Sequence, residues 1–198
     1  MSKESERAEL RQVRAVPTNF QTRELEDGTP IIEGYFAVFG DVYQIGPGMS
    51  ESIAPGAFTE ALDEDDVRAL INHDTTLVLG RNTAGTLALT QDEHGLFGTV
   101  QINPNDRSAM DCYARVQRGD VSGCSFGFEI AAEDTDISDD GSVHWTITKV
   151  KPLYEVSCCT FPAYPETNIE ARSKEREELR QRKHEAWKAT MLKKLKGE

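Results

Sequence analysis

The stretch GDVSGCSFGFEI, residues 119–130, alternates small residues with large apolar ones. Side chains two residues apart in a β-strand lie on the same face of a sheet, so this alternation predicts a strand with one buried face. The face expected to point into the core consists of Ser122, Cys124, Phe126, Phe128 and Ile130. Ser125 lies on the opposite face, between Gly123 and Gly127, and this face is expected to be open and to point outward.

Two interpretations of Ser125 are open at this point. Glycine within a strand often marks a place where another backbone comes close, so a serine between two glycines suits a nucleophile that attacks a peptide carbonyl. Alternatively, a strand rich in glycine and serine forms a tight barrel corner and does no chemistry. A serine hydroxyl is a weak nucleophile until a neighbouring base takes its proton, so the nucleophile interpretation requires a base elsewhere in the chain.

Four histidines are candidates for that base. His73 is the strongest, because its INHD stretch lies at the polar end of a strand predicted at 66–74. His144, within SVHWTIT, is the second candidate. His94 lies in an acidic turn and His184 in a charged C-terminal segment, and both are expected to face solvent. A single histidine at a strand end is often only structural, and that alternative stays open.

A catalytic histidine also needs a partner that orients its other ring nitrogen. Glu155, in PLYEVSCCTF, is an acidic residue in a predicted strand that otherwise reads as half buried. Its simpler interpretation is a glutamate on a solvent-facing side. Asp74 is adjacent to His73 in sequence and is the alternative partner, although neighbours along a strand point to opposite faces.

The remaining sequence predicts an α+β protein that is mainly β, either a barrel or a sandwich with helices attached. Strands are expected within 14–25, 31–40, 66–74, 76–103, 121–130, 143–150 and 153–161. Short helices are expected at 55–62 and 105–119, the second capped by Asn105 or Asp106 and closed by Gly119. The acidic segment 131–142 reads as a loop, and 173–195 as a charged helix.

Composition limits the classes of partner. The net charge of −12 argues against nucleic acid. From Arg172 onward ten Lys/Arg and five Glu give +5, which leaves −17 for residues 1–171. An acidic body with a basic tail suggests two segments with different roles. Two interpretations of the tail are open: a docking arm, or a solvated charged helix.

Four cysteines without CxxC spacing and four scattered histidines give no pattern for a metal site, and no cofactor is expected. No apolar run approaches the roughly 20 residues needed to span a bilayer, so no membrane partner is expected. The N-terminus lacks the apolar core of a secretory signal, which predicts a cytosolic protein.

Several blocks of the sequence resemble a known family. GYFAVFG, ESIAPGAFTEAL, VRALINHDTTLVLGR, GLFGTVQIN, GDVSGCSFGFEI and LYEVSCCTFPAYPET occur in the order seen in prohead maturation proteases of tailed bacteriophages. The resemblance covers roughly residues 12–171. That family is similar to the herpesvirus assembly proteases, which implies a compact β-barrel surrounded by short helices.

The resemblance implies a serine endopeptidase with Ser125 as nucleophile, His73 as general base and Glu155 as the residue that orients it. His144 is the alternative to Glu155 as the third member of the catalytic triad, since the herpesvirus enzymes use a second histidine in that role. Two small departures are Tyr164, where the family often has asparagine, and Cys124, where it often has methionine or leucine. Neither touches the implied chemistry.

The resemblance further implies that the substrates are the capsid or scaffold precursor protein and the protease itself, cut inside the immature capsid in the host cytoplasm. The expected organisation is a flexible N-terminus at 1–12, a protease domain at 13–171, and a basic helical tail at 172–198 that self-cleavage could remove. A dimer or higher assembly is compatible with this organisation.

Two other functions compete. A non-catalytic scaffold or shell protein of the same fold would tolerate Ser125→Ala. An esterase should show a GxSxG turn between a strand and a helix, and GCSFG matches that pattern. The residues after it continue a strand pattern instead, which argues against an esterase.

Overall fold

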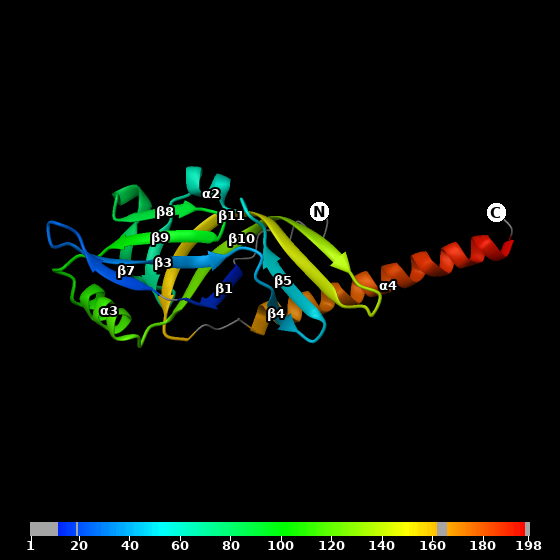
Figure 1. The fold of residues 1–198 in the computed structure, drawn as a ribbon. Helices are drawn as coiled ribbons and strands as arrows, with labels where there is room; N and C mark the ends of the chain where they lie inside the picture. Colours follow the sequence, from blue (N-terminus) through cyan, green and yellow to red (C-terminus); the bar gives the residue numbers. More distant parts are fainter. Residues whose placement is uncertain (1–11, 19, 162–165, 197–198) are drawn as a thin grey trace.

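The computed structural model describes residues 12–18, 20–161 and 166–196, which form two β-sheets with helices around them (Figure 1). The larger sheet contains seven strands: β1 (Gln12–Pro17), β4 (Tyr43–Gly46), β5 (Met49–Ile53), β6 (Arg68–Ile71), β7 (Asp74–Arg81), β10 (Gly123–Ile137) and β11 (Val143–Cys159). The smaller sheet has the order β2 (Gln21–Glu24), β3 (Pro30–Val38), β9 (Gly95–Gln101) and β8 (Leu87–Gln91). The helices are α2 (Thr59–Glu64), the 3-10 helix η1 (Asn82–Ala84), α3 (Arg107–Arg118) and α4 (Glu166–Lys196).

The long antiparallel hairpin of β10 and β11 is the backbone of the larger sheet. On one side, β1 pairs antiparallel with the first part of β10. On the other side, β11 pairs in parallel with β5 through its first half and with β6 through its second half. The segments that carry the candidate site residues are therefore adjacent: β10 and β11 are neighbours, and β6 lies beside the end of β11.

Apolar side chains of both sheets form one core, and the stretch that predicted the fold contributes to its centre. Phe126 and Phe128 are both fully buried, and their ring centroids lie 4.8 Å apart. Phe58, just before α2, packs edge-on against Phe126 with a centroid distance of 5.7 Å. Burial of an aromatic side chain of this size contributes about 1.5–3 kcal/mol, so this face fixes which side of β10 points inward.

The inward face predicted from the alternation is confirmed for Cys124, Phe126, Phe128 and Ile130. The prediction for Ser122 is wrong: β10 begins at Gly123, and Ser122 is exposed before the first strand residue. The loop predicted at 131–142 is also mostly wrong. β10 continues to Ile137, because antiparallel pairing with β11 satisfies its backbone while Asp134 and Asp136 face solvent and Glu133 is half buried.

Among the described residues, strand pairing leaves two separate sheets, so the predicted closed barrel is wrong. The two sheets instead pack through their apolar faces. The predicted helix at 105–119 is confirmed as α3: the Asp106 carboxylate accepts hydrogen bonds from the Ser108 and Ala109 amides, and Gly119 ends the helix with a left-handed backbone. The helix predicted at 55–62 is confirmed as α2, which begins later, at Thr59.

The C-terminal helix α4 runs beside β4 and β5 and then extends beyond the hairpin (Figure 1). Near its start, the Arg172 side chain is buried, although it stands at the predicted boundary between domain and tail. Residues 181–188 are all exposed. At the other end of the chain, residues 1–11 lie outside the described part, and Gln12 is a buried strand residue that pairs with Phe128.

Among the described residues, no helix has the length and apolarity needed to cross a bilayer.

Candidate active site

His73 lies in the two-residue turn that joins β6 to β7. Ile71 pairs with Asp74 across the turn, and the two central residues, Asn72 and His73, have φ angles of 49° and 62°. Positive φ at both central positions is the geometry of a type I′ hairpin, in which asparagine is favoured and glycine usually follows. A histidine in the second position is costly for the backbone. Such strain persists only where surrounding contacts hold it, and it is often found at functional sites.

Hydrogen bonds from the end of β11 hold this turn in place. The Asn72 amide donates to the Cys158 carbonyl at 3.0 Å, and the Asn72 side-chain oxygen accepts from the Thr160 amide at 2.9 Å. The His73 amide donates to Ser157 Oγ at 3.3 Å. The parallel pairing of β6 with β11 brings these residues together, because it aligns Ile71 with Cys158.

The imidazole of His73 is bound to Glu155. Its Nδ1 lies 2.7 Å from Glu155 Oε1, and the other carboxylate oxygen accepts a hydrogen bond from Ser157 Oγ at 2.6 Å. The Glu155 side chain is 3% exposed and that of His73 is 29% exposed, so the carboxylate is buried while the ring still reaches the surface. Because a carboxylate accepts at Nδ1, the neutral ring carries its proton there and leaves Nε2 as an acceptor.

Ser125 lies on the same face of the sheet as Glu155. It is directly opposite Ser157 in the antiparallel pairing of β10 with β11, and cross-strand partners point to the same face. Glu155 is two residues before Ser157 and therefore shares that face. The prediction that Ser125 points outward on an open face is wrong: its side chain is fully buried, because β1 pairs with this part of β10. The Ser125 hydroxyl donates a hydrogen bond to the Arg14 carbonyl of β1 at 2.7 Å.

The second ring nitrogen of His73 faces a thiol. Cys159 Sγ lies 3.8 Å from His73 Nε2, at the end of β11. Burial, together with the negative charge of Glu155, raises the pKa of the Cys159 thiol to about 12. This thiol is therefore neutral near pH 7, and a neutral thiol is a poor nucleophile.

The other candidates from the sequence have different partners. His144 lies between two hydroxyls of β5, with Ser50 Oγ 2.8 Å from Nδ1 and Ser52 Oγ 2.8 Å from Nε2. The Asp74 carboxylate accepts from the amide and hydroxyl of Thr76. His94 and His184 are exposed, as predicted. The structure thus pairs His73 with Glu155 rather than with Asp74.

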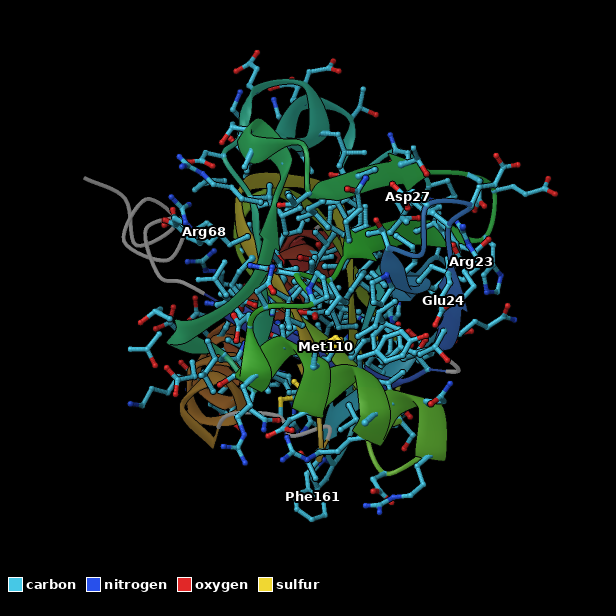
Figure 2. All side chains as sticks on the ribbon, turned by 90° about the vertical axis from the view of Figure 1, so that its left-hand side faces the viewer. Arg23, Glu24, Asp27, Arg68, Met110 and Phe161 are labelled. Carbon is cyan, nitrogen blue, oxygen red and sulfur yellow. The ribbon has the colours of Figure 1, made fainter. Side chains whose placement is uncertain are left out.

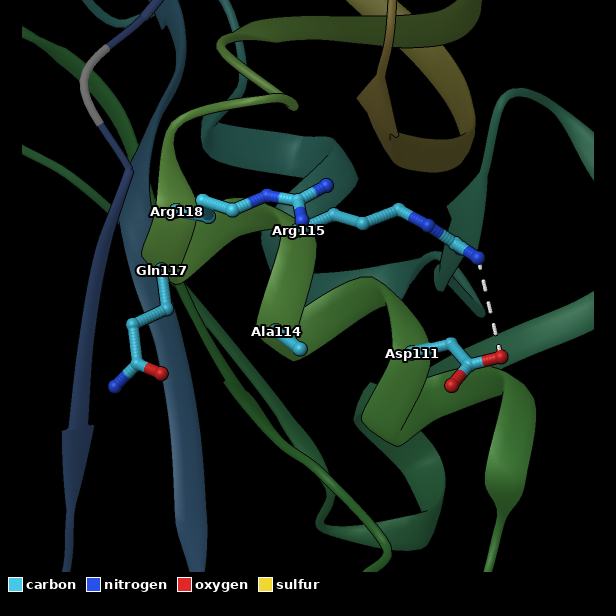
Figure 3. Close-up of a pocket in the computed structure, with 5 residues that line it drawn as sticks. All are labelled: Asp111, Ala114, Arg115, Gln117 and Arg118. Atoms are coloured by element: carbon cyan, nitrogen blue, oxygen red, sulfur yellow. Dashed lines mark ion pairs between the residues drawn. The ribbon is translucent and has the colours of Figure 1, made fainter.

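A separate hollow lies on the outer face of α3, lined by Asp111, Ala114, Arg115, Gln117 and Arg118 (Figure 3). Its lining is polar, with Asp111 and Arg115 forming a loose ion pair at 3.8 Å. Ser125, His73 and Glu155 do not line this hollow.

Figure 2 shows Met110 on α3. It also shows Phe161, which follows the end of β11 and is 82% exposed.

Three residues at the site were missed by the sequence analysis. Ser157 had a usable signal, because it follows Glu155 by two residues in the same predicted strand and must share its face. Asn72 also had one, since asparagine favours the first central position of a type I′ turn. Arg14 had none: its carbonyl meets Ser125 through pairing between distant segments.

The model of the family named caudovirus prohead serine protease matches residues 18–182, a range that includes all three candidate residues. The chain belongs to this family. The resemblance identified from the sequence is therefore confirmed at the level of the family.

The chain is similar to two phage proteases, one by sequence and one by fold. The prohead protease of Enterobacteria phage HK97 is 35% identical over 144 residues, which are 71% of this chain and 59% of that protein. The chain thus spans about three fifths of the length of this curated relative. The capsid assembly protease gp21 of bacteriophage T4 shares the fold with a TM-score of 0.52 and 11% identity, over 77% of this chain and 98% of gp21.

Proposed function

We propose that this chain is a serine endopeptidase in which Ser125 attacks the peptide carbonyl, His73 is the general base and Glu155 orients His73. The observation that carries the proposal is the His73–Glu155 hydrogen bond of 2.7 Å on the face of the sheet that bears Ser125. Membership of the prohead serine protease family supports the same assignment.

The proposed mechanism passes through an acyl-enzyme. His73 Nε2 takes the proton of Ser125 as the hydroxyl oxygen attacks the carbonyl carbon, and the resulting imidazolium is stabilised by the Glu155 carboxylate. The imidazolium then gives its proton to the leaving amine, and water hydrolyses the ester by the same route. Main-chain amides would stabilise the oxyanion, each contributing about 3 kcal/mol.

In the structure, the Ser125 hydroxyl is bonded to the Arg14 carbonyl instead of the histidine. Attack on a substrate therefore requires the hydroxyl to change partners, and the fully buried Ser125 must become accessible. Catalytic hydrogen bonds in substrate-free enzymes often form only when the substrate binds, so this arrangement is compatible with the proposal.

The proposed substrates are the capsid or scaffold precursor protein and the protease itself, cleaved inside the prohead in the host cell. The relatives support this assignment, since one is a prohead protease and another a capsid assembly protease. The similarity to herpesvirus assembly proteases stays a prediction from the resemblance. The basic charge of the tail left two interpretations open, a docking arm and a solvated charged helix, and the exposed residues 181–188 of α4 are compatible with both.

The test is the intact mass of the purified chain over time, for wild type and Ser125→Ala, each alone and co-expressed with its capsid protein. Shortening of the wild type or of the capsid protein, without shortening in the variant, would support the proposal. If wild type and variant leave every chain whole even in the presence of capsid protein, the proposal fails and a non-catalytic assembly role takes its place.

A further inference from the structure

We propose that Ser157 is a positioning residue that fixes both Glu155 and His73 in the orientation needed for proton transfer. This inference rests on the proposed function, because it assigns a fourth residue to the same site. Ser157 is fully buried on β11, directly opposite Ser125. It is bound to Glu155 and to the His73 amide, and we infer that it acts through these two residues.

The Ser157 hydroxyl forms hydrogen bonds in two directions. It donates to Glu155 Oε2 at 2.6 Å and accepts from the His73 amide at 3.3 Å. A hydroxyl has one donor and two acceptor positions, so these bonds use its donor and one acceptor. The Ser157 hydroxyl oxygen thereby links the side chain of Glu155 to the backbone of His73.

The bond to Glu155 determines which carboxylate oxygen faces the imidazole. Oε2 is bound to Ser157, while Oε1 lies 2.7 Å from His73 Nδ1. A carboxylate bound at both oxygens has its plane fixed, and the ring that it binds is fixed with it.

The bond to the His73 amide acts on the backbone. His73 has a φ of 62°, a conformation that non-glycine residues adopt only when neighbours hold it. The Asn72 contacts with Cys158 and Thr160 secure one residue of this turn, and the Ser157 hydroxyl contacts the other. Without that contact, the His73 amide loses its hydrogen bond to the strand that carries the orienting carboxylate.

The chain contains a matched control. Ser52 on β5 is also a buried strand serine whose hydroxyl contacts a histidine on β11, here His144 Nε2 at 2.8 Å. Replacing it with alanine removes the same hydroxyl from a buried strand position and ends a hydrogen bond with a different histidine. Because His144 has no role in the proposed mechanism, Ser52→Ala measures the purely structural effect of such a change.

The experiment compares Ser157→Ala, Ser157→Cys, Ser157→Thr and Ser52→Ala with wild type, all as full-length chains. The first readout is the proton NMR signal of His73 Nδ1–H, assigned with His73→Gln, which reports the bond to Glu155 without requiring activity. The second is the rate at which a fluorophosphonate probe acylates Ser125, with Ser125→Ala as the blank. Thermal unfolding accompanies both readouts.

We expect Ser157→Ala to shift or broaden the His73 signal and to slow acylation roughly 10- to 100-fold, as removal of outer hydrogen-bond partners typically does. Ser157→Thr keeps the hydroxyl, so most of the His73 Nδ1–H signal and most of the acylation rate should be retained. Ser52→Ala should leave both unchanged. Ser157→Cys preserves the volume with a weaker donor, and it provides the same comparison if the alanine variant does not fold.

The inference is overturned if folded Ser157→Ala or Ser157→Cys keeps the His73 signal and an acylation rate within twofold of wild type, or if Ser52→Ala slows acylation as much as Ser157→Ala does. If the probe fails to label wild-type Ser125 even in the presence of capsid protein, the proposed function fails separately. The His73 signal then still decides whether Ser157 positions the ring.

Discussion

The hydroxyl of Ser125 donates a hydrogen bond to the main-chain carbonyl of Arg14, 2.7 Å away on the neighbouring strand. The side chain of the same arginine is bound to the buried carboxylate of Glu51, which also accepts a hydrogen bond from Arg172 at 2.7 Å. Contacts therefore run from the start of the C-terminal helix through Glu51 to the strand that binds the candidate nucleophile.

Replacement of the nucleophile is the most direct prediction. Ser125→Ala should abolish labelling by a fluorophosphonate probe and lower peptide cleavage by roughly a thousandfold or more. Ser122→Ala is the control, because Ser122 is exposed just before β10 in the same stretch of sequence. Equal labelling of Ser125→Ala and wild type, read by intact mass, would remove Ser125 from the mechanism.

The choice of orienting carboxylate can be tested with two isosteric changes. Glu155→Gln should slow acylation by roughly a thousandfold or more, because the amide no longer stabilises the imidazolium or selects the Nδ1–H form of His73. Asp74→Asn should leave the rate within about twofold, since the Asp74 carboxylate binds Thr76. A larger loss for Asp74→Asn than for Glu155→Gln would assign the role to the sequence neighbour instead.

Arg172 is expected to be central to stability. Its guanidinium binds Glu51 and Glu133 and lies 4.4 Å above the ring of Trp145. Removing one partner from a buried ion-pair network costs about 3–5 kcal/mol, so Arg172→Ala should lower the free energy of unfolding by that order, measured by urea denaturation.

The control for Arg172 is an exposed arginine of the same helix. Arg180 is 53% exposed, and Arg180→Ala should change the free energy of unfolding by less than about 0.5 kcal/mol. Deletion of residues 181–198 should be similarly mild, whereas deletion from 172 onward should be as costly as Arg172→Ala. If both deletions are equally mild, the start of α4 does not belong to the stable body.

The buried network also predicts acid sensitivity. Burial by itself would raise the pKa of Glu51, but the charges and hydrogen bonds of Arg14 and Arg172 outweigh it and hold the pKa below its usual 4.5. A carboxyl whose pKa is lowered by folding contributes stability above its unfolded pKa and loses it as the pH falls through the folded value. The free energy of unfolding should therefore decrease as the pH drops below about 4.5.

In Glu51→Gln this dependence should be weaker, because the variant lacks the stabilising charge of Glu51 at neutral pH and therefore has less stability to lose in acid. Urea denaturation at a series of pH values measures both slopes. Asp66, whose pKa is lowered mainly by its hydrogen bond with Arg81, contributes in the same direction, so Asp66→Asn is the comparison for surface ion pairs. If the free energy of unfolding changes equally with pH in wild type and Glu51→Gln, Glu51 is not a source of the acid sensitivity.

The thiol beside His73 gives a prediction about inhibitors. With a pKa raised to about 12, Cys159 should be alkylated very slowly by iodoacetamide in the folded protein at pH 7–8. Cys159→Ala should retain acylation of Ser125 by the fluorophosphonate probe. Rapid inactivation by iodoacetamide that Cys159→Ala abolishes would indicate a cysteine nucleophile, and peptide mapping of the alkylated residue would decide the question.

The sequence alone determined the features that depend on local periodicity and local turn chemistry. The two-residue alternation of β10 placed Phe126 inside and Ser125 on the other face, because adjacent strand side chains point in opposite directions. The cap residue Asp106 and Gly119 set the ends of α3 for equally local reasons. His73 was identified as the candidate base from its position at the end of a strand.

Only the tertiary structure decided which distant segments meet. Parallel pairing of β6 with β11 brings His73 to Glu155 across 82 residues, and β1 brings the Arg14 carbonyl to Ser125 across 111. Arg172 inserts beside Glu51 from 121 residues away. The periodicity of a strand shows which face a residue occupies but not which strand will be its neighbour, because that choice depends on the packing of the whole core.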